Sequence, residues 1–249
     1  MNDVTVILNG YRRPQNLSKQ IEAVKSQTIK PQDIFYWQNT VPDVPYDNAL
    51  SSANCISAYS NTNFGVWSRF YYALNARTNW VCIFDDDTIP GSKWFENCLT
   101  TINQIPDAGL LCTIGIIVNH ANYGFERRIG WDNPNETAEQ VDFGGHAWFF
   151  HRDMLSLMWR ELPPINHQWN VGEDIHFSWM LQKYSNYKTY VPPHPKNDQQ
   201  MWGSIDGWRL GGDSVATAGN GAIPYMAKYL RHAYDNGFRM ILGDKVRTD

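Results

Sequence analysis

The chain has 249 residues, which is long enough for one large domain or for two small lobes that share a sheet. Its net charge of −4 argues against the strongly basic surface of a nucleic-acid-binding protein. The four cysteines lack metal-ligand spacing and are expected to be reduced core residues. No signal peptide or membrane-spanning segment is visible, which favours a cytoplasmic protein or a soluble domain of a larger or membrane-anchored parent.

The first half of the chain alternates apolar strands with helices that carry one apolar face. The predicted elements are, in order, a strand at 4–9, a helix through Leu17, Ile21 and Val24, strands at 34–37 and 55–59, a helix with Val66, Phe70 and Leu74 on one face, a strand at 80–84 and a helix at about 92–104. This alternation is typical of a mostly parallel sheet with right-handed crossovers. We therefore expect an α/β fold.

The second half of the chain is less regular. The predicted elements are a strand at 110–118, a polar segment at 119–140 that forms a hairpin or a mobile loop, a strand at 147–150, a helix to about 161, a buried helix at 173–184, a candidate flexible lid at 196–221 and an amphipathic helix at about 223–234. No repeat or linker separates independent domains, so we expect a single domain over residues 1–249.

Three consecutive acids, Asp85, Asp86 and Asp87, follow the apolar run at 80–84. In open α/β sheets, ligands bind beyond the carboxyl ends of the strands, which is where these side chains are expected. Adjacent carboxylates repel one another unless a cation lies among them, and oxygen ligands suit Mg²⁺ or Mn²⁺ together with the phosphates of a substrate. The three acids therefore predict a metal–diphosphate site. The alternative is a solvated acidic turn before Pro90.

Two other functions fit part of this pattern. Asp85 and Asp87 match the Asp-x-Asp of a HAD-type phosphatase, but that nucleophile normally follows the first strand, and three strands precede it here. A non-catalytic carbohydrate-binding module could hold glycans with some of the eleven tryptophans, but it would not explain the strand–helix alternation. Calorimetry separates these functions, because only a transferase would bind a nucleoside diphosphate in a metal-dependent way.

Several motifs, taken in order, carry a family resemblance. They are ILNGYRRPQNL, YWQN, NFGVWSRF, VCIFDDD, GGHAWFFHRDML and VGEDIHFSWMLQKY. Together they resemble the GT-A-fold nucleotide-sugar glycosyltransferases, both the family-2-type enzymes and the C-terminal domain of the exostosin-like glycosyltransferases. The resemblance covers Val4 to about Leu242. It implies a Rossmann-like nucleotide-sugar-binding half at about 1–105 and an acceptor-binding half with a C-terminal loop and helix at about 106–249.

The resemblance places the nucleotide beyond the first two strands. It implies that Gly10, Tyr11 and Arg12 hold the uracil and the ribose, and that Asn39 contacts the base. Glycine at position 10 would let the backbone approach a ligand, although an ordinary strand-to-helix turn uses the same residue. Asn39 is likewise an ordinary residue for a turn at a strand end.

Three further residues match donor-binding positions of the family. Asn63 would contact the base, Arg69 the phosphates, and Arg247 the diphosphate in a C-terminal segment where the match is loose. An arginine in the first turn of a helix opposes the helix dipole, which favours a ligand role for Arg69 over a solvated surface position. His194 follows a strand in the turn VPPHP, but the exostosin-like pattern has no histidine there, so we leave it out of the metal site.

The resemblance also implies a separate binding role for each of the three acids. Asp87 would bind Mn²⁺ or Mg²⁺ directly. Asp85 would belong to the same metal site and would also bind the ribose. Asp86 would reach the metal through water or contact the sugar. The metal would act as a Lewis acid and template as the diphosphate leaves.

The remaining matches concern the acceptor and the chemistry. Gly144, Gly145 and His146 would line the acceptor side, with a bulge or a tight strand entry as the alternative for the glycines. Glu173 and Asp174 begin a helix after Gly172, where an acid would serve as general base in an inverting enzyme or lie beside the donor sugar in a retaining one. Simple helix capping is the alternative.

The sequence therefore predicts a metal-dependent glycosyltransferase. We expect its donor to be a nucleotide-diphosphate sugar linked to UDP and its acceptor to be a hydroxyl group of a glycan or glycoconjugate.

Overall fold

The computed structural model describes residues 3–39, 55–131, 133–164, 170–206, 208–212, 216 and 221–243. Arg247, predicted to bind the diphosphate, lies outside these residues.

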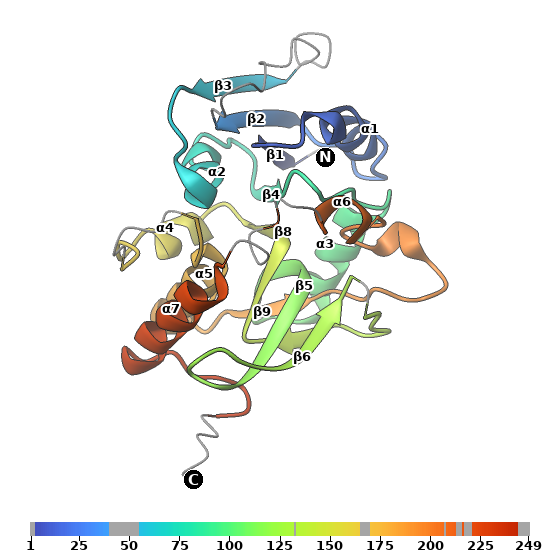
Figure 1. Cartoon of the computed structure of the whole chain (residues 1–249). Coiled ribbons are helices and arrows are strands. Elements are labelled where there is room, and N and C mark those ends of the chain that lie inside the picture. The colour runs from blue at the N-terminus through green and yellow to red at the C-terminus, as the bar shows by residue number, and fades with distance from the viewer. Residues whose placement is uncertain are drawn as a thin grey trace.

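The N-terminal half is built around four parallel strands (Figure 1). They are β1 (Val4–Gly10), β2 (Asp33–Asn39), β3 (Ile56–Ser60) and β4 (Trp80–Phe84), in the spatial order β3-β2-β1-β4. The intervening helices are η1 (Pro14–Asn16) with α1 (Leu17–Lys25), η3 (Gly65–Trp67) with α2 (Ser68–Ala73), and α3 (Trp94–Gln104), which follows β4. Strands β1 and β4 are continuous apolar runs because helices cover both faces of the sheet there.

The C-terminal half contributes the other strands and helices. The strands are β5 (Ala108–His120), β6 (Gly124–Gly130), β7 (Glu139–Val141), β8 (Phe143–His151) and β9 (Lys188–Val191). The helices are α4 (Met154–Met158), α5 (Glu173–Tyr184), η4 (Gln199–Met201), α6 (Trp208–Gly211) and α7 (Ile223–Asp235). Strands β5 and β6 form the hairpin that was one of two possibilities for residues 119–140.

Over the described residues, all nine strands belong to one sheet of order β3-β2-β1-β4-β8-β5-β9-β7, with β6 paired to β5. Strand β8 runs antiparallel between β4 and β5. Following the pairings from β1, six strands (β1 to β5 and β9) run in one direction and β6, β7 and β8 run in the other. The predicted α/β fold with a mostly parallel central sheet is therefore confirmed.

Two apolar layers cover the two faces of the sheet. Alternate residues of β1 and β4, such as Ile7 and Ile83, pack with α2, α5 and α7 on one face. Their neighbours, such as Val6 and Cys82, pack with α1 and α3 on the other face. Figure 1 shows α2, α5 and α7 together on one side, away from α1. This alternation follows from the two-residue period of a strand and leaves the carboxyl ends of the strands as the edge where polar groups gather.

Several local predictions were wrong in extent. Helix α2 ends at Ala73, and Leu74, expected on its buried face, is 56% exposed because the buried side of this short helix carries Arg69, Phe70 and Ala73 instead. Helix α4 ends at Met158 rather than near 161. The described part of the candidate lid includes η4 and α6, and its Trp202 and Ser204 are buried.

The cysteines are free thiols, as predicted, and three of the four are buried. Burial raises the pKa of Cys98 well above its ordinary value, which keeps this thiol protonated and unreactive. Among the described residues, no helix has both the length and the apolar character needed to cross a bilayer.

Candidate active site

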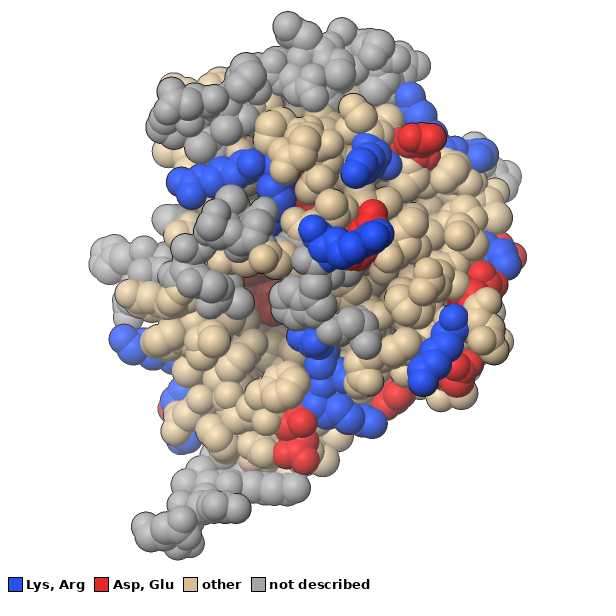
Figure 2. All heavy atoms as spheres, turned by 45° about the vertical axis from the view of Figure 1, so that its right-hand side comes forward, with Lys and Arg blue, Asp and Glu red and all other residues tan. Residues whose placement is uncertain are grey.

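The polar cluster lies where β4 ends, next to the carboxyl end of β1 and against β8. Leu8 of β1 pairs with Phe84 of β4, so Asn9 and Gly10 lie beside the turn that begins at Asp85. Asp86 and Asp87 are only 7% and 6% exposed. In Figure 2, acidic atoms lie deep in a hollow near the middle of the face, with basic side chains around it. The solvated acidic turn considered as an alternative is therefore excluded.

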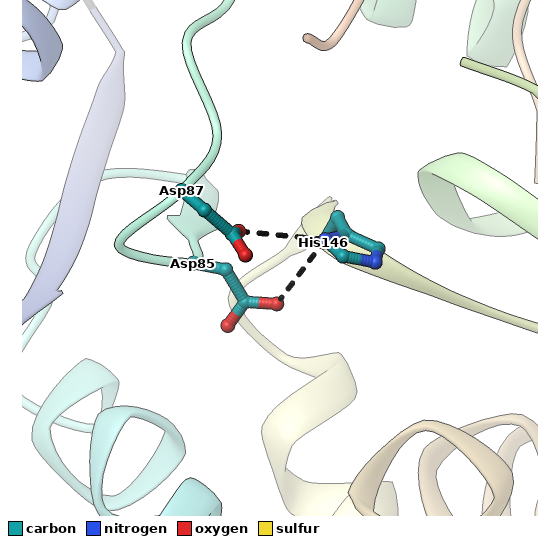
Figure 3. A group of neighbouring side chains, drawn as sticks. All are labelled: Asp85, Asp87 and His146. Atoms are coloured by element: carbon teal, nitrogen blue, oxygen red, sulfur yellow. Dashed lines mark ion pairs between the residues drawn. The ribbon is translucent and has the colours of Figure 1, made fainter. Parts of the chain in front are cut away.

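Asp85, Asp87 and His146 form the centre of this cluster. One ligand atom of each residue lies within 4.8 Å of the others. His146 Nδ1 is 3.5 Å from Asp87 Oδ1 and 3.8 Å from Asp85 Oδ2, and Figure 3 shows both carboxylates directed at the imidazole ring. Two carboxylates and an imidazole that converge at this separation suit a divalent cation.

His146 reaches the acids through an irregularity in β8. Gly145 pairs with Ile114 and Trp148 with Cys112, so three steps along β8 match two along β5, which is a β-bulge. Within the bulge His146 has φ 64, and its carbonyl accepts a hydrogen bond from Asp85 N at 2.9 Å. A β-bulge, the alternative explanation for the two glycines, is thus present. It places His146, which was predicted to lie on the acceptor side, beside the acids.

Arg69 connects the acids after β4 with the start of α5. Its Nη1 donates to an oxygen of Asp85 and, at 3.3 Å, to Asn9 Oδ1, and its Nη2 donates to Glu173 Oε1 at 2.8 Å. The guanidinium lies over the Trp148 ring, 4.4 Å from its centre. Arg69 is 4% exposed, so the solvated-surface alternative is wrong. The predicted phosphate contact stays a prediction.

Arg13 and α1 hold the turn from the other side. Arg13 Nη1 lies 2.7 Å from Asp86 Oδ1 and 3.1 Å from Asp87 Oδ2. Asn16 Nδ2 donates to the Asp86 carbonyl at 2.9 Å, and Gln20 Nε2 donates to the Asp85 carbonyl at 2.6 Å. The backbone of the acid turn is therefore fixed by side chains of the N-terminal helix.

The electrostatic balance of the cluster favours a cation. Among the described residues, five carboxyl groups interact with the guanidinium groups of Arg13 and Arg69; the acids are Asp85, Asp86, Asp87, Glu173 and Asp174. Burial, with Asp87 beside it, raises the pKa of Asp86 to about 6. Burial alone would also raise the pKa of Asp87, but His146 and Arg13 outweigh it and lower this pKa. The residues therefore fit a divalent metal ion, which would offset the remaining negative charge.

Glu173 and Asp174 begin α5 after Gly172, whose φ is 95. The Glu173 carboxylate is held by Arg69, whereas Asp174 Oδ1 accepts a hydrogen bond from Ile175 N at 2.7 Å. Asp174 is half-buried, and burial raises its pKa to about 6. A carboxyl group with such a pKa is ionised at neutral pH and can accept a proton, as the predicted base requires.

The residues predicted to bind the nucleotide lie at the ends of β1 and β2. A Cβ at Gly10 would lie 2.0 Å from Tyr36 Oη, so a larger residue there would displace the buried Tyr36 ring. The Arg12 guanidinium lies over the Tyr11 ring, 5.0 Å from its centre. These positions border the acid turn, and their contacts with a base or a ribose stay predictions.

The two asparagines predicted to contact the base order the segment before α2. Asn39 accepts from Trp37 Nε1 at 3.0 Å and from Phe64 N at 3.1 Å, and it donates to the Gly65 carbonyl at 3.0 Å. Asn63 Oδ1 accepts from Gly65 N at 2.8 Å. Asn39 is buried and uses both ends of its amide within the protein, so a contact with the base would have to replace one of these bonds.

The two glycines of β8 differ from each other. A Cβ at Gly144 would lie 2.5 Å from the Ile114 carbonyl, so strand packing requires glycine there. At Gly145 the nearest atoms would be 3.7 Å away, so a side chain would fit. His194 is fully buried and accepts from Gly203 N at Nε2 while Nδ1 lies 2.8 Å from the Pro192 carbonyl. Both ring nitrogens of His194 thus make polar contacts within the protein, which agrees with leaving His194 out of the metal site.

Sequence reasoning did not identify Arg13, Asn16 and Gln20, or the place of His146 beside the acids. A signal existed for Asn16 and Gln20, because they share the helix face of Leu17, Ile21 and Val24 and are buried with it. No local pattern indicates that β8 lies next to β4.

The Arg69 network leads to a prediction about stability. Removing Arg69 leaves Asp85 and Glu173 without their cation in a largely buried site, so Arg69→Ala should lower the free energy of unfolding by about 3 kcal/mol. Urea denaturation measures this change. Arg127 makes a comparable 2.8 Å pair with Glu139 but is 54% exposed, so Arg127→Ala should cost less than about 1 kcal/mol. Equal losses in the two variants would contradict a structural role for the Arg69 network.

Comparison with known proteins gives a likeness of fold. No protein-family model matches the sequence, and no curated protein matches it at a significant level. A UDP complex of S. aureus TarS residues 1–349 matches with a TM-score of 0.55 and 15% identity, over 78% of this chain and 58% of that one. A UDP-GlcNAc complex of the same TarS segment matches with a TM-score of 0.51 and 14% identity, over 80% and 60%. The chain thus spans less than two thirds of these structures, and the likeness agrees with the mixed α/β architecture.

Proposed function

We propose that this protein is a metal-dependent glycosyltransferase that moves a sugar from a UDP-linked donor to a hydroxyl group of a glycan or glycoconjugate. The observation that carries the proposal is the convergence of Asp85 and Asp87, after β4, with His146 of β8, and with Asp174 close enough to interact with the charges of Arg69 and Asp85. The fold resembles TarS structures that contain UDP and UDP-GlcNAc, which supports a nucleotide sugar as the donor.

The residues have distinct tasks in this reaction. Asp85, Asp87 and His146 would hold Mn²⁺ or Mg²⁺, which when bound stabilises the charge of the departing diphosphate. The residues at the ends of β1 and β2 would hold the nucleoside, as predicted from the sequence. Arg69 would position both Asp85 and Glu173, since it contacts both carboxylates.

Asp174 would act on the acceptor. In an inverting reaction its carboxylate takes the proton from the acceptor hydroxyl as that oxygen bonds to the anomeric carbon and the bond from this carbon to the diphosphate breaks. In a retaining reaction the same carboxylate would support the positive charge that develops on the donor sugar. Glu173 is engaged by Arg69, which favours Asp174 for either task. The resemblance to exostosin-like domains stays a prediction.

A nucleotide panel tests the proposal. Thermal unfolding is followed with UDP, GDP and several UDP-sugars, each with Mn²⁺ and with EDTA. Because a ligand at 100 times its Kd stabilises a protein by about 2.7 kcal/mol, UDP should raise the Tm, and only when metal is present. Binding of glycans without any nucleotide would favour a carbohydrate-binding module. A protein that responds to neither UDP nor UDP-sugars would contradict the proposal.

A further inference from the structure

We propose that Tyr229 of α7 is a positioning residue for Asp174, and that it holds the first turn of α5 in place without touching either substrate. The inference rests on the proposed function, in which Asp174 acts on the acceptor, and it extends the site to the helix near the end of the chain. Helix α7 packs against α5 (Figure 1), and its Tyr229 is buried.

The start of α5 is supported by a packed ring where many helices have a side-chain cap. Gly172 occupies the N-cap position at φ 95, and glycine has no side chain that could supply a capping oxygen. A Cβ on Gly172 would lie 2.4 Å from Tyr229 Cδ2 and 2.6 Å from Tyr229 Cε2, so the tyrosine ring lies directly against this backbone. Glu173 and Asp174 follow at once. The ring therefore supports the turn that carries both carboxyl groups.

A chain of hydrogen bonds holds the Tyr229 ring in this orientation. His176 Nε2 lies 2.9 Å from the Met158 carbonyl, which can only accept, so this nitrogen carries the proton. His176 Nδ1 is then an acceptor, and the Tyr229 hydroxyl donates to it at 3.1 Å. Burial lowers the pKa of His176 to about 4, so the imidazole is neutral at pH 7 and keeps this arrangement. Since Gly172 and His176 are four residues apart on one face of α5, a single tyrosine contacts both.

The same tyrosine belongs to an aromatic cluster next to the segment that carries Arg69. The centre of the Trp67 ring is 6.4 Å from that of Tyr229 and 5.5 Å from that of His176. Trp67 is fully buried and precedes Arg69 by two residues, and Arg69 donates to Glu173. The cluster therefore supports both the helix that carries the acids and the arginine that binds one of them.

Tyr229 contributes by position and does not exchange protons itself. Burial, with the charges of Glu173 and Asp174 nearby, raises the pKa of Tyr229, so its hydroxyl stays protonated and engaged with His176. A general base must lie within about 2.6–3.2 Å of the group whose proton it removes, and a displacement of about 1 Å can cost about 10²-fold in rate. Removing the ring should therefore reduce kcat more than it changes the binding of UDP.

The test compares two variants of Tyr229 with a control on the same helix. Tyr229→Phe keeps the ring and removes the hydroxyl, whereas Tyr229→Leu removes the ring from Gly172 and keeps an apolar side chain. Tyr234 packs against the same core from α7, so Tyr234→Leu is the matched control. Steady-state kinetics with a UDP-sugar donor, calorimetry with UDP and Mn²⁺, and urea denaturation are measured for each protein.

We expect kcat to fall by at least about threefold in Tyr229→Phe and by about 10–100-fold in Tyr229→Leu, because a displaced base slows the chemical step. The UDP affinity should be unchanged in both variants, since the nucleotide is held elsewhere. Tyr234→Leu should keep its kcat even if it lowers the free energy of unfolding as much as Tyr229→Leu does. Nitrogen NMR should show a protonated Nε2 on His176, and an altered Nδ1 signal in Tyr229→Phe.

A Tyr229→Leu variant that keeps the kcat of Tyr234→Leu would overturn the proposal. If Tyr229→Leu does not fold, an unchanged kcat in Tyr229→Phe would overturn it alone. Metal-dependent UDP binding and sugar transfer by the unaltered protein would leave the proposed function standing in either case. An unaltered protein that neither binds UDP nor transfers sugar would contradict the proposed function instead.

Discussion

The Asp174→Asn variant should lose at least about 10² in kcat while its UDP affinity and Tm stay close to those of the unaltered protein. A general base contributes on that scale, and the amide of asparagine cannot accept the proton. The asparagine oxygen can still accept the hydrogen bond from Ile175 N that Asp174 Oδ1 accepts now, so the start of α5 should remain intact. Steady-state kinetics with a UDP-sugar donor and calorimetry with UDP separate the two effects.

The pH dependence of the unaltered protein should include the titration of the same group. Burial raises the pKa of Asp174 to about 6, and only the ionised form can accept a proton. Activity should therefore be full above this pH and fall as the pH drops through about 6. The free energy of unfolding should change in the opposite direction with pH. Because the pKa of this carboxyl group is raised in the folded protein, its ionisation destabilises the fold as the pH rises. Asp174→Asn should therefore not be less stable than the unaltered protein at pH 7.

The exposed Asp153 supplies a control, since its side chain is 74% exposed. Asp153→Asn should leave kcat and Tm unchanged. An Asp174→Asn variant that keeps more than half of the original kcat would remove this residue from the chemistry. Glu173→Gln would then be the next variant to test, with the complication that it also weakens the pair with Arg69.

The second large effect is expected at Asp87. Asp87→Asn should abolish the metal-dependent binding of UDP and reduce turnover by at least about 10²–10³, the scale for loss of a group that stabilises transition-state charge. The physical reason is that Asp87 Oδ1 is one of the atoms that converge with Asp85 and His146. Calorimetry with UDP in the presence of Mn²⁺, and again with EDTA, measures the binding.

Asp107 is a suitable control for this change, because its carboxylate pairs with the surface residue Lys188 at 2.8 Å. Asp107→Asn should bind UDP and metal as the unaltered protein does. Full activity of the unaltered protein in EDTA would show that transfer does not need the metal at all. Metal-dependent UDP binding that survives in Asp87→Asn would instead exclude this residue as a ligand.

Much of the architecture follows from local patterns. The apolar runs at β1 and β4 and the apolar face of α1 were predicted close to their observed bounds, because strands covered on both faces are short continuous apolar runs and burial imposes a period of 3.6 residues on helices. The start of α5 at Glu173 was also predicted, from acidic residues after Gly172. Leu74 was misplaced because helix α2 has six residues, and so short a periodic pattern does not define where the helix ends.

The position of the acids could be predicted for a similar reason. A strand that is apolar until Phe84 must end where three aspartates begin, and the carboxyl ends of parallel strands share one edge of the sheet. The sequence by itself therefore determined that a charged cluster lies at the ligand-binding edge. It did not determine which of the three acids face one another.

That division was decided by tertiary structure. Asp86 and one oxygen of Asp87 pair with Arg13, Asp85 and Asp87 face His146, and Arg69 joins Asp85 to Glu173. These partners come from the residue before η1 and from α2, β8 and α5, so their meeting depends on the antiparallel insertion of β8 beside β4 and on helices packed against the sheet. Strand order and helix docking are set by long-range packing of the whole core, which no local window of sequence contains.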